Sequence, residues 1–168
     1  YIFNFGQMRF KYGLPSGYAA LNTTALPDAT IADGSEYFDI ALYTGTGNSG
    51  QTVSGLNFSP DLVWFKSRSA TQNHAVFDTV RGAEKRLHPN LIQAEDDSSS
   101  GLTAFNSDGF TFGSNNVNGA SGTTYVAWAW DAGSSTVSNT DGSLTSSVRA
   151  NTSAGFSIVK YTSGSGSQ

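Results

Sequence analysis

The stretch over residues 123–131 constrains the fold of this chain more than any other. It reads Thr-Thr-Tyr-Val-Ala-Trp-Ala-Trp-Asp. Side chains alternate between the two faces of a β-strand, so Trp128 and Trp130 share one face and two small alanines share the other. The wealth of aromatic and β-branched residues favours a central strand. Its best partner is the apolar run at residues 61–66, which supplies the third tryptophan. We expect both to be core strands of a β-sandwich.

The composition agrees with many short strands joined by polar turns. Charged residues make up only 13% of the chain, and 19 of its 168 residues are Gly. Helix-compatible residues gather at 83–92, where Pro89 would end a helix. The predicted class is all-β, with antiparallel sandwich modules of jelly-roll or concanavalin A-like type in tandem and at most one or two short helices. Further strands are expected at residues 37–44, 74–80, 102–105 and 109–112, the last two joined by an Asn-Ser-Asp-Gly turn.

A short repeat indicates more than one module. Residues 38–44, Phe-Asp-Ile-Ala-Leu-Tyr-Thr, align with residues 156–162, Phe-Ser-Ile-Val-Lys-Tyr-Thr, at an offset of 156 − 38 = 118 residues. An alanine and a serine upstream of each copy match at the same offset. Repeats of this kind are typical of arrays. We expect a linker at 22–34, one module over 31–133, a second linker over 134–149, and the start of a second module over 150–168.

The composition also argues against several functional classes. The net charge of −4 disfavours a nucleic-acid partner, because phosphate binding needs clustered Lys and Arg. No apolar run approaches the ~18 residues of a membrane-spanning helix, so we expect no membrane insertion. The absence of Cys excludes disulfides, thiolate metal sites and cysteine nucleophiles.

The carboxylates give weak support for catalysis or for a metal site. A glycosidase needs two carboxylates about 5–5.5 Å or 6.5–9.5 Å apart. Asp61 resembles a turn residue, and Asp78 is expected to pair locally with Arg81. We therefore predict no enzyme activity, no catalytic residue and no cofactor. Solvated loop acids are far commoner than calcium sites, but oxygen ligands for Ca²⁺ could come from Asp96, Asp97, Asp108, Asn115 and Asn116.

The candidate contact residues form two groups. Trp128 and Trp130 could stack on a pyranose ring if their indoles are exposed and coplanar, and the alternative is burial in the core or at a subunit contact. Arg81, Lys85 and Arg86, together with Arg68, form a small basic cluster that could meet an acidic glycan or a neighbouring subunit. The alternative for this cluster is a solvated face without a partner.

Sequence motifs that cover nearly the whole chain match a recurring pattern. Residues 3–23 carry Asn-Phe-Gly-Gln, an aromatic run, Pro-Ser-Gly-Tyr and a Leu-Asn-Thr exit. They resemble the last strand and exit of SPRY-like, concanavalin A-like domains in large virion proteins of marine phages, although Met8 stands where a basic residue is usual. The rest resembles an uncharacterised module that follows such domains. Its marks include Gly-Leu-Asn-Phe-Ser-Pro-Asp-Leu-Val-Trp-Phe-Lys (55–66), Phe-Asp-Thr-Val-Arg-Gly (77–82), Phe-Asn-Ser-Asp-Gly-Phe (105–110) and Tyr-Val-Ala-Trp-Ala-Trp (125–130).

The resemblance implies that residues 1–30 are the C-terminal end of a SPRY-like domain with its exit linker, and it implies no catalytic residue. It further implies a virion structural protein, a module of a fibre, appendage or surface decoration that helps adsorb to the host surface. Expected partners are further copies of itself, for example in a trimer, other virion proteins and a host-surface glycan. The alternatives are a carbohydrate-binding module of a secreted or cell-surface protein and a subunit of a bacterial surface filament.

Overall fold

The structure is a computed structural model that describes residues 12–18 and 29–163. The chain divides into two compact units, Tyr1–Ala32 and Asp33–Gln168. The second unit contains nearly all of the described residues, and every regular element of the fold discussed below lies within it.

The first unit is described only in part. The Tyr18 amide donates a hydrogen bond of 3.1 Å to the Pro15 carbonyl and closes a turn. The expected end of a preceding domain over residues 1–30 and the expected linker at 22–34 lie largely outside the described residues. Both therefore remain predictions.

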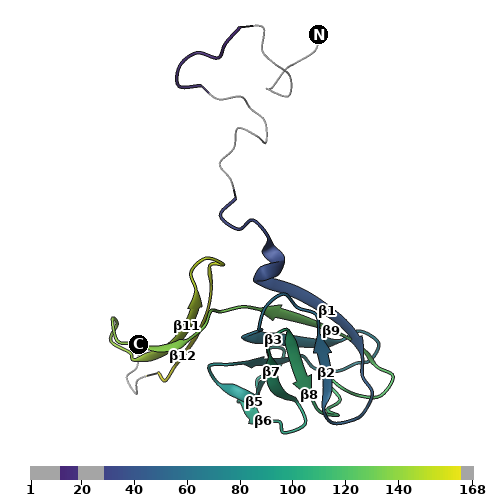
Figure 1. Cartoon of the computed structure of the whole chain (residues 1–168). Coiled ribbons are helices and arrows are strands. Elements are labelled where there is room, and N and C mark those ends of the chain that lie inside the picture. The colour runs from purple at the N-terminus through teal and green to yellow at the C-terminus, as the bar shows by residue number, and fades with distance from the viewer. Residues whose placement is uncertain (1–11, 19–28, 164–168) are drawn as a thin grey trace. The chain divides into compact units, whose positions relative to one another are not determined.

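The second unit is all-β in its described part, as predicted, with a single turn of 3-10 helix, η2 (Gly34–Glu36), as its only helix (Figure 1). Its strands form three antiparallel sheets of six, three and three strands. The six-stranded sheet has the order β1 (Phe38–Thr44), β9 (Thr124–Trp130), β3 (Leu62–Ser67), β4 (Ala75–Asp78), β5 (Gly82–Leu87) and β6 (Asp96–Asp97). The second sheet has the order β2 (Gln51–Ser54), β8 (Gly109–Phe112) and β7 (Leu102–Asn106). The third has the order β10 (Thr136–Asn139), β11 (Ser146–Asn151) and β12 (Phe156–Tyr161).

Strand β9 is central, as its composition predicts. It pairs antiparallel with β1 on one edge and with β3 on the other. The registers place Trp128 opposite Ile40 in β1 and opposite Trp64 in β3. The predicted pairing of the two tryptophan-bearing strands is confirmed.

The core lies between the six-stranded sheet and the sheet β2–β8–β7. The inner face of the large sheet consists of alternate residues that are fully buried, and the facing strands contribute further aromatics. The Phe65 ring meets Phe110 edge-on at 5.2 Å and Phe77 at 5.9 Å, a favourable geometry for aromatic pairs. Two facing sheets that share one core form a β-sandwich. The fully buried hydrophobic residues of this core are Val63, Phe65, Ala75, Phe77, Leu102, Phe110, Phe112, Ala127 and Ala129.

The predicted hairpin between β7 and β8 is present, with Asn106 opposite Gly109. The glycine is required by the neighbouring strand β2, because a Cβ at position 109 would lie 1.9 Å from the Val53 carbonyl oxygen. Strand β2 can therefore pair with β8 this close to the turn only because residue 109 has no side chain.

The short helix expected within residues 83–92 and ended by Pro89 is absent, and that prediction was wrong. Most of this segment is strand β5, which pairs with β4 on one edge and with β6 on the other. Glu84 has a positive φ of 69°, which bends the strand where its register with β4 shifts. Pairing on both edges outweighs the weak helix propensity of these residues.

The segment 134–149, expected to be a linker, contains β10 and the beginning of β11. These strands join β12 in one antiparallel sheet, in which Val148 lies opposite both Val137 and Val159. The start of the repeat at β12 is thus hydrogen-bonded to the segment that precedes it.

Candidate functional site

The outer face of the six-stranded sheet is the most distinctive surface of the described residues. Trp64, Trp128 and Trp130 project from β3 and β9, and His74 lies beside them just before β4. These four side chains line a wholly apolar hollow of about 280 Å³. The outer face of a sandwich sheet is usually polar, so an aromatic hollow there indicates a contact surface.

The hollow is held in shape by ring contacts and one side-chain hydrogen bond. The Trp64 and Trp128 rings meet edge-to-face, with centroids 6.0 Å apart and planes inclined by 68°. The Trp64 indole N–H donates to Nδ1 of His74 at 2.9 Å. Desolvation lowers the pKa of His74, and the nearby Lys66 lowers it further. His74 is thereby favoured in the neutral form that accepts this bond.

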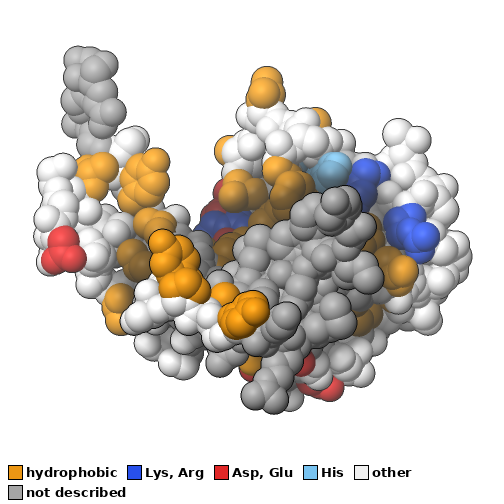
Figure 2. All heavy atoms as spheres, turned by 90° about the horizontal axis from the view of Figure 1, so that it is seen from above, with side chains coloured by type: hydrophobic (Ala, Val, Ile, Leu, Met, Phe, Trp, Pro, Cys, Tyr) orange, Lys and Arg blue, Asp and Glu red, His pale blue; other side chains and the backbone are white. Residues whose placement is uncertain are grey.

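The apolar surface continues onto the edge strand β1. Phe38, Ile40 and Leu42 occupy its outer face and are 38%, 47% and 62% exposed. Hydrophobic side chains gather on the surface seen in Figure 2, next to a histidine and to basic side chains. Residue alternation along a strand places these three side chains on one face, and the structure shows that this face is the outer one.

Trp130 marks the junction between the sandwich and the C-terminal sheet. Its ring contacts Phe38 at 5.0 Å on its own sheet and stacks on Phe156 of β12 at 5.9 Å, with planes inclined by 20°. The Asn151 amide donates to the Asp131 carboxylate at 2.8 Å. One of the two candidate tryptophans therefore already has an aromatic cover within the chain.

A buried ion pair adds a polar anchor to the same junction. The Asp61 carboxylate lies 2.7 Å from the Nε of Arg149 in β11, although this N–H is not aligned for a regular hydrogen bond. Asp61 also accepts bonds from the Thr79 hydroxyl and the Ala132 amide. Asp61 lies in a bend directly before β3, in agreement with the expected turn, and it also links the sandwich to the C-terminal sheet.

An open hollow of about 420 Å³ adjoins this anchor. Its lining comes from both the sandwich and the C-terminal sheet, with Asp131 and Arg149 as its charged members. Both charged side chains are already engaged, Asp131 with Asn151 and Arg149 with Asp61. The hollow is therefore a seam between the two sheets.

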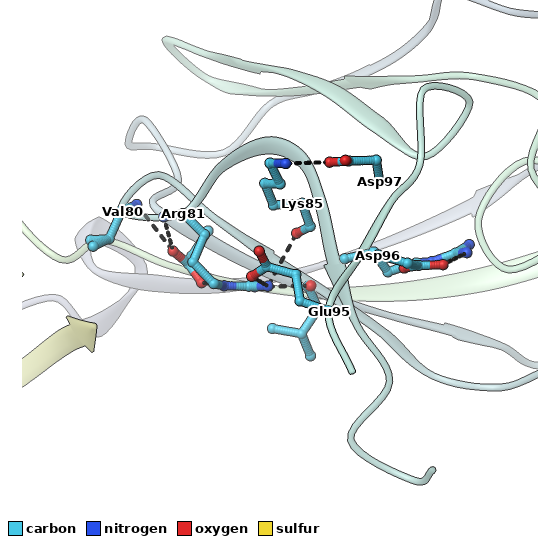
Figure 3. A network of polar contacts seen from close by, with 9 residues as sticks. Val80, Arg81, Lys85, Glu95, Asp96 and Asp97 are labelled. Atoms are coloured by element: carbon cyan, nitrogen blue, oxygen red, sulfur yellow. Dashed lines mark hydrogen bonds and ion pairs between the residues drawn. The ribbon is translucent and has the colours of Figure 1, made fainter. Parts of the chain in front are cut away.

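Three members of the basic cluster are neutralised inside the module (Figure 3). Arg81 pairs with Asp78, as predicted, and lies 3.2 Å from Glu95. Lys85 pairs with Asp97, which raises the pKa of Lys85 through a hydrogen bond. A glycan or subunit contact through these cations would have to compete with partners already in place.

Arg86 completes the ladder between β5 and β6. Its guanidinium lies 2.6 Å from the Asp96 carboxylate, and this hydrogen bond lowers the pKa of Asp96. Two of the carboxylates considered for Ca²⁺ are thus ion-paired partners of β5. Within residues 12–18 and 29–163, no group of three or more His, Asp or Glu side chains is placed to hold a metal ion.

Sequence reasoning did not assign three residues to this surface and its junction, namely His74, Phe156 and Arg149. His74 could have been recognised because it directly precedes β4, and β4 pairs with β3, the strand that carries Trp64. Phe156 belongs to the repeat, but no local sequence feature indicates its contact with Trp130.

In the part of the chain that the structure describes, no helix is long and apolar enough to cross a membrane.

No curated protein and no solved structure matches this chain at a significant level. A family model described as a domain of unknown function, DUF7483, matches residues 33–168. The match begins at the first residue of the second compact unit and includes all three sheets. The chain therefore belongs to the DUF7483 family.

Proposed function

We propose that this chain is a structural module of a phage virion, chained to similar modules in a fibre, appendage or surface decoration. In this role it displays surfaces outward and helps adsorption to the host through many weak contacts, which arrays convert into avidity. It acts outside the cell as part of the particle, in contact with further copies of itself and with other virion proteins. It performs no catalysis. The virion setting draws its support from the sequence resemblance.

One observation carries the tandem part of this proposal. The two copies of the repeated strand are preceded by the same kind of side-chain hydrogen bond. The Ser35 amide donates to Oδ1 of Asp33 at 2.9 Å before β1, and the Ser153 amide donates to Oδ1 of Asn151 at 3.0 Å before β12. A chain that repeats both its first strand and the side-chain hydrogen bond before it has the pattern expected of an array. Arrays of small sandwiches suit a structural role.

The edge strand β1 supports self-association. Its outer face is apolar and exposed, and the described residues cover only one of its backbone edges, through β9. Exposed apolar edge strands without Lys or Pro tend to pair with another chain. A neighbouring protomer in the particle would cover this edge.

A carbohydrate-binding module is the second candidate, and the hollow lined by three tryptophans favours it. Two features oppose a flat stacking platform. The Trp64 and Trp128 planes are inclined by 68°, and Trp130 is covered by Phe156. Saturable binding on a glycan array that is lost on Trp128→Ala would establish this second candidate.

The proposed function is tested by electron microscopy of purified particles with antibodies raised against residues 33–163. Label at regular positions on a tail, fibre or capsid surface is expected, and antibody absorbed with the purified module serves as the control. Particles that lack the protein would overturn the virion proposal.

A further inference from the structure

Strands β1 and β12 are alike in sequence but differ in their surroundings. Phe38, Ile40, Tyr43 and Thr44 recur at the equivalent positions 156, 158, 161 and 162. In β1, the Tyr43 ring stacks on Tyr125 at 5.3 Å and its hydroxyl donates to the Asn118 carbonyl at 2.7 Å. The equivalent Tyr161 is 63% exposed. The same tyrosine is thus a core residue in one copy and a surface residue in the other.

The neighbouring inward position shows the same contrast. Ala41 packs against the core cluster, whereas the equivalent Val159 is 52% exposed. The opposite face of each strand is apolar, with Phe38 on β1 and Phe156 on β12. Both of these rings contact Trp130. Strand β12 therefore carries the side chains of a first sandwich strand, but in the described part of the chain no second sheet covers them.

Among the described residues, β12 pairs along one backbone edge only, and its other edge is the one that β1 uses to bind β9. In β1, the Tyr37 carbonyl accepts from the Asp131 amide, so by alternation the backbone groups of Ala41 and Tyr43 also point toward β9. In the C-terminal hairpin, the Asn151 carbonyl accepts from the Gly155 amide and therefore points toward β12.

Asn151 lies opposite Phe156, so this pair is of the hydrogen-bonded type. The backbone groups of Phe156 therefore face β11. By alternation, those of Val159 and Tyr161 face the open edge of the sheet. Strands β1 and β12 thus correspond in two respects: the same side chains share a face, and the same backbone groups point to the same edge.

We infer that β12 is the docking strand for a second sandwich of this family. A strand equivalent to β9 would pair with it antiparallel, in the register that places Trp130 opposite Phe38 and Tyr125 opposite Tyr43. The second sandwich would cover Val159 and Tyr161. The sheet β10–β11–β12 would then continue into the large sheet of the next module, and the stacking of Phe156 on Trp130 would fix the two modules to each other.

Two positions limit the equivalence. Ser163 stands where β1 is followed by Gly45, a position at which a Cβ would lie 2.3 Å from the Ala120 carbonyl oxygen. The equivalence therefore ends at Thr162. Ile31 stands at the position equivalent to Arg149, so the ion pair with Asp61 belongs to the C-terminal junction. The inference rests on the proposed role as a tandem module and adds the strand and register that join the modules.

A chimeric chain tests the docking directly. Residues 1–162 are followed by a second copy of residues 45–133, which lacks its own first strand and directly follows β12. We expect the appended copy to fold, and hydrogen exchange at the amides of Val159 and Tyr161 to slow by at least about 100-fold relative to the parent chain. An appended copy that exchanges at unfolded rates, beside an intact first module, would overturn the inference.

Tyr161→Asp provides the matched control. In the parent chain the side chain is exposed, so the melting temperature should stay within about 3 °C. In the chimera the same change places a carboxylate in the core and should unfold the appended copy. An unaffected chimera would contradict the register.

A graft into the first strand tests the equivalence without new chain. Asp39→Ser, Ala41→Val and Leu42→Lys convert residues 38–44 into the sequence of 156–162. The triple variant should fold and melt within about 5 °C of the parent chain. An unfolded triple variant would overturn the equivalence. If the double variant Asp39→Ser, Leu42→Lys then folds, the failure is due to the valine at position 41, which corresponds to Val159. Both experiments use purified protein, so their outcome is independent of the protein's place in a particle.

Discussion

The two faces of the six-stranded sheet are built from the same strands but differ in what covers them. On the inner face, Val63, Phe65 and Phe77 are completely buried under the sheet β2–β8–β7. On the outer face, Trp64 and Trp128 are only half-buried and surround an apolar hollow. Hydrophobicity is high on both faces. The difference shows that the inner face holds the fold together, whereas the outer face remains available for contacts.

The strongest test of this comparison is a pair of truncations at adjacent residues. Phe65→Ala should lower the free energy of unfolding by about 3–5 kcal/mol, because it opens a cavity in the closed core. Trp64→Ala should lower it by only about 1–2 kcal/mol, through the lost ring contact with Trp128 and partial burial. Urea melts of the two variants measure both values. Equal losses would show that the outer face is as closed as the inner one.

The second test concerns the anchor beside the outer face. Arg149→Ala leaves the buried Asp61 carboxylate without its cation and should lower the free energy of unfolding by about 2–3 kcal/mol. This is below the usual range for a buried pair, because Arg149 keeps some exposure. Hydrogen exchange should increase first in β11 and β12. Arg68→Ala, at an exposed arginine, is the control. A uniform increase in hydrogen exchange over the whole sandwich in Arg149→Ala would argue against a local anchor.

The third test uses pH to probe the outer face. The pKa of His74 is lowered in the folded state, so the unfolded chain binds the proton more readily. The stabilisation from neutral His74 should be complete above the unfolded pKa of about 6.5 and lost progressively as the pH falls through the lowered folded pKa.

His74→Gln isolates this contribution because Gln keeps an acceptor for the Trp64 indole but does not titrate in this range. Thermal melts at pH 8 and pH 5 should show a smaller pH dependence in the variant than in the parent chain. Identical pH dependence in the two proteins would exclude His74 as a titrating part of the surface.

The smallest effect is expected away from both faces. Lys85 and Asp97 form an exposed ion pair on β5 and β6, and exposed pairs contribute little to stability. Lys85→Ala should leave the urea midpoint unchanged within experimental error. The deeper Arg81, which also donates to the Val76 and Lys85 carbonyls, should give a measurable loss on Arg81→Ala. The reverse order would show that the charged ladder is organised differently in solution.

Much of the sandwich follows from local pattern. Alternation and β-branched content predicted β1, β3, β4 and β9, and the Asn-Ser-Asp-Gly turn predicted the β7–β8 hairpin. Strand β5 was not predicted because Gly-Ala-Glu-Lys-Arg-Leu has no apolar alternation, and its place depends on pairing along both edges. Strand β10 lies in a Ser/Thr-rich stretch whose composition is equally typical of a linker.

The site was less predictable than the fold. Alternation shows which side chains share a face, but not which face a second sheet covers, when both carry large aromatics. Asp61 and Arg149 are 149 − 61 = 88 residues apart, and nothing local to either residue indicates the other. The repeat was visible in the sequence, whereas the exposure of Tyr161 required the structure.

The edge position of β1 has a consequence for the synthesis of the chain. Its only partner among the described strands, β9, begins 124 − 38 = 86 residues later. At roughly 5–20 residues per second, a ribosome needs roughly 4–17 s to make this interval. Throughout that time β1, with Phe38, Ile40 and Leu42, lacks the strand that it pairs with in the folded protein. Folding must therefore await the last strand of the sandwich, and a chaperone that shields the first strand would raise the yield of native protein.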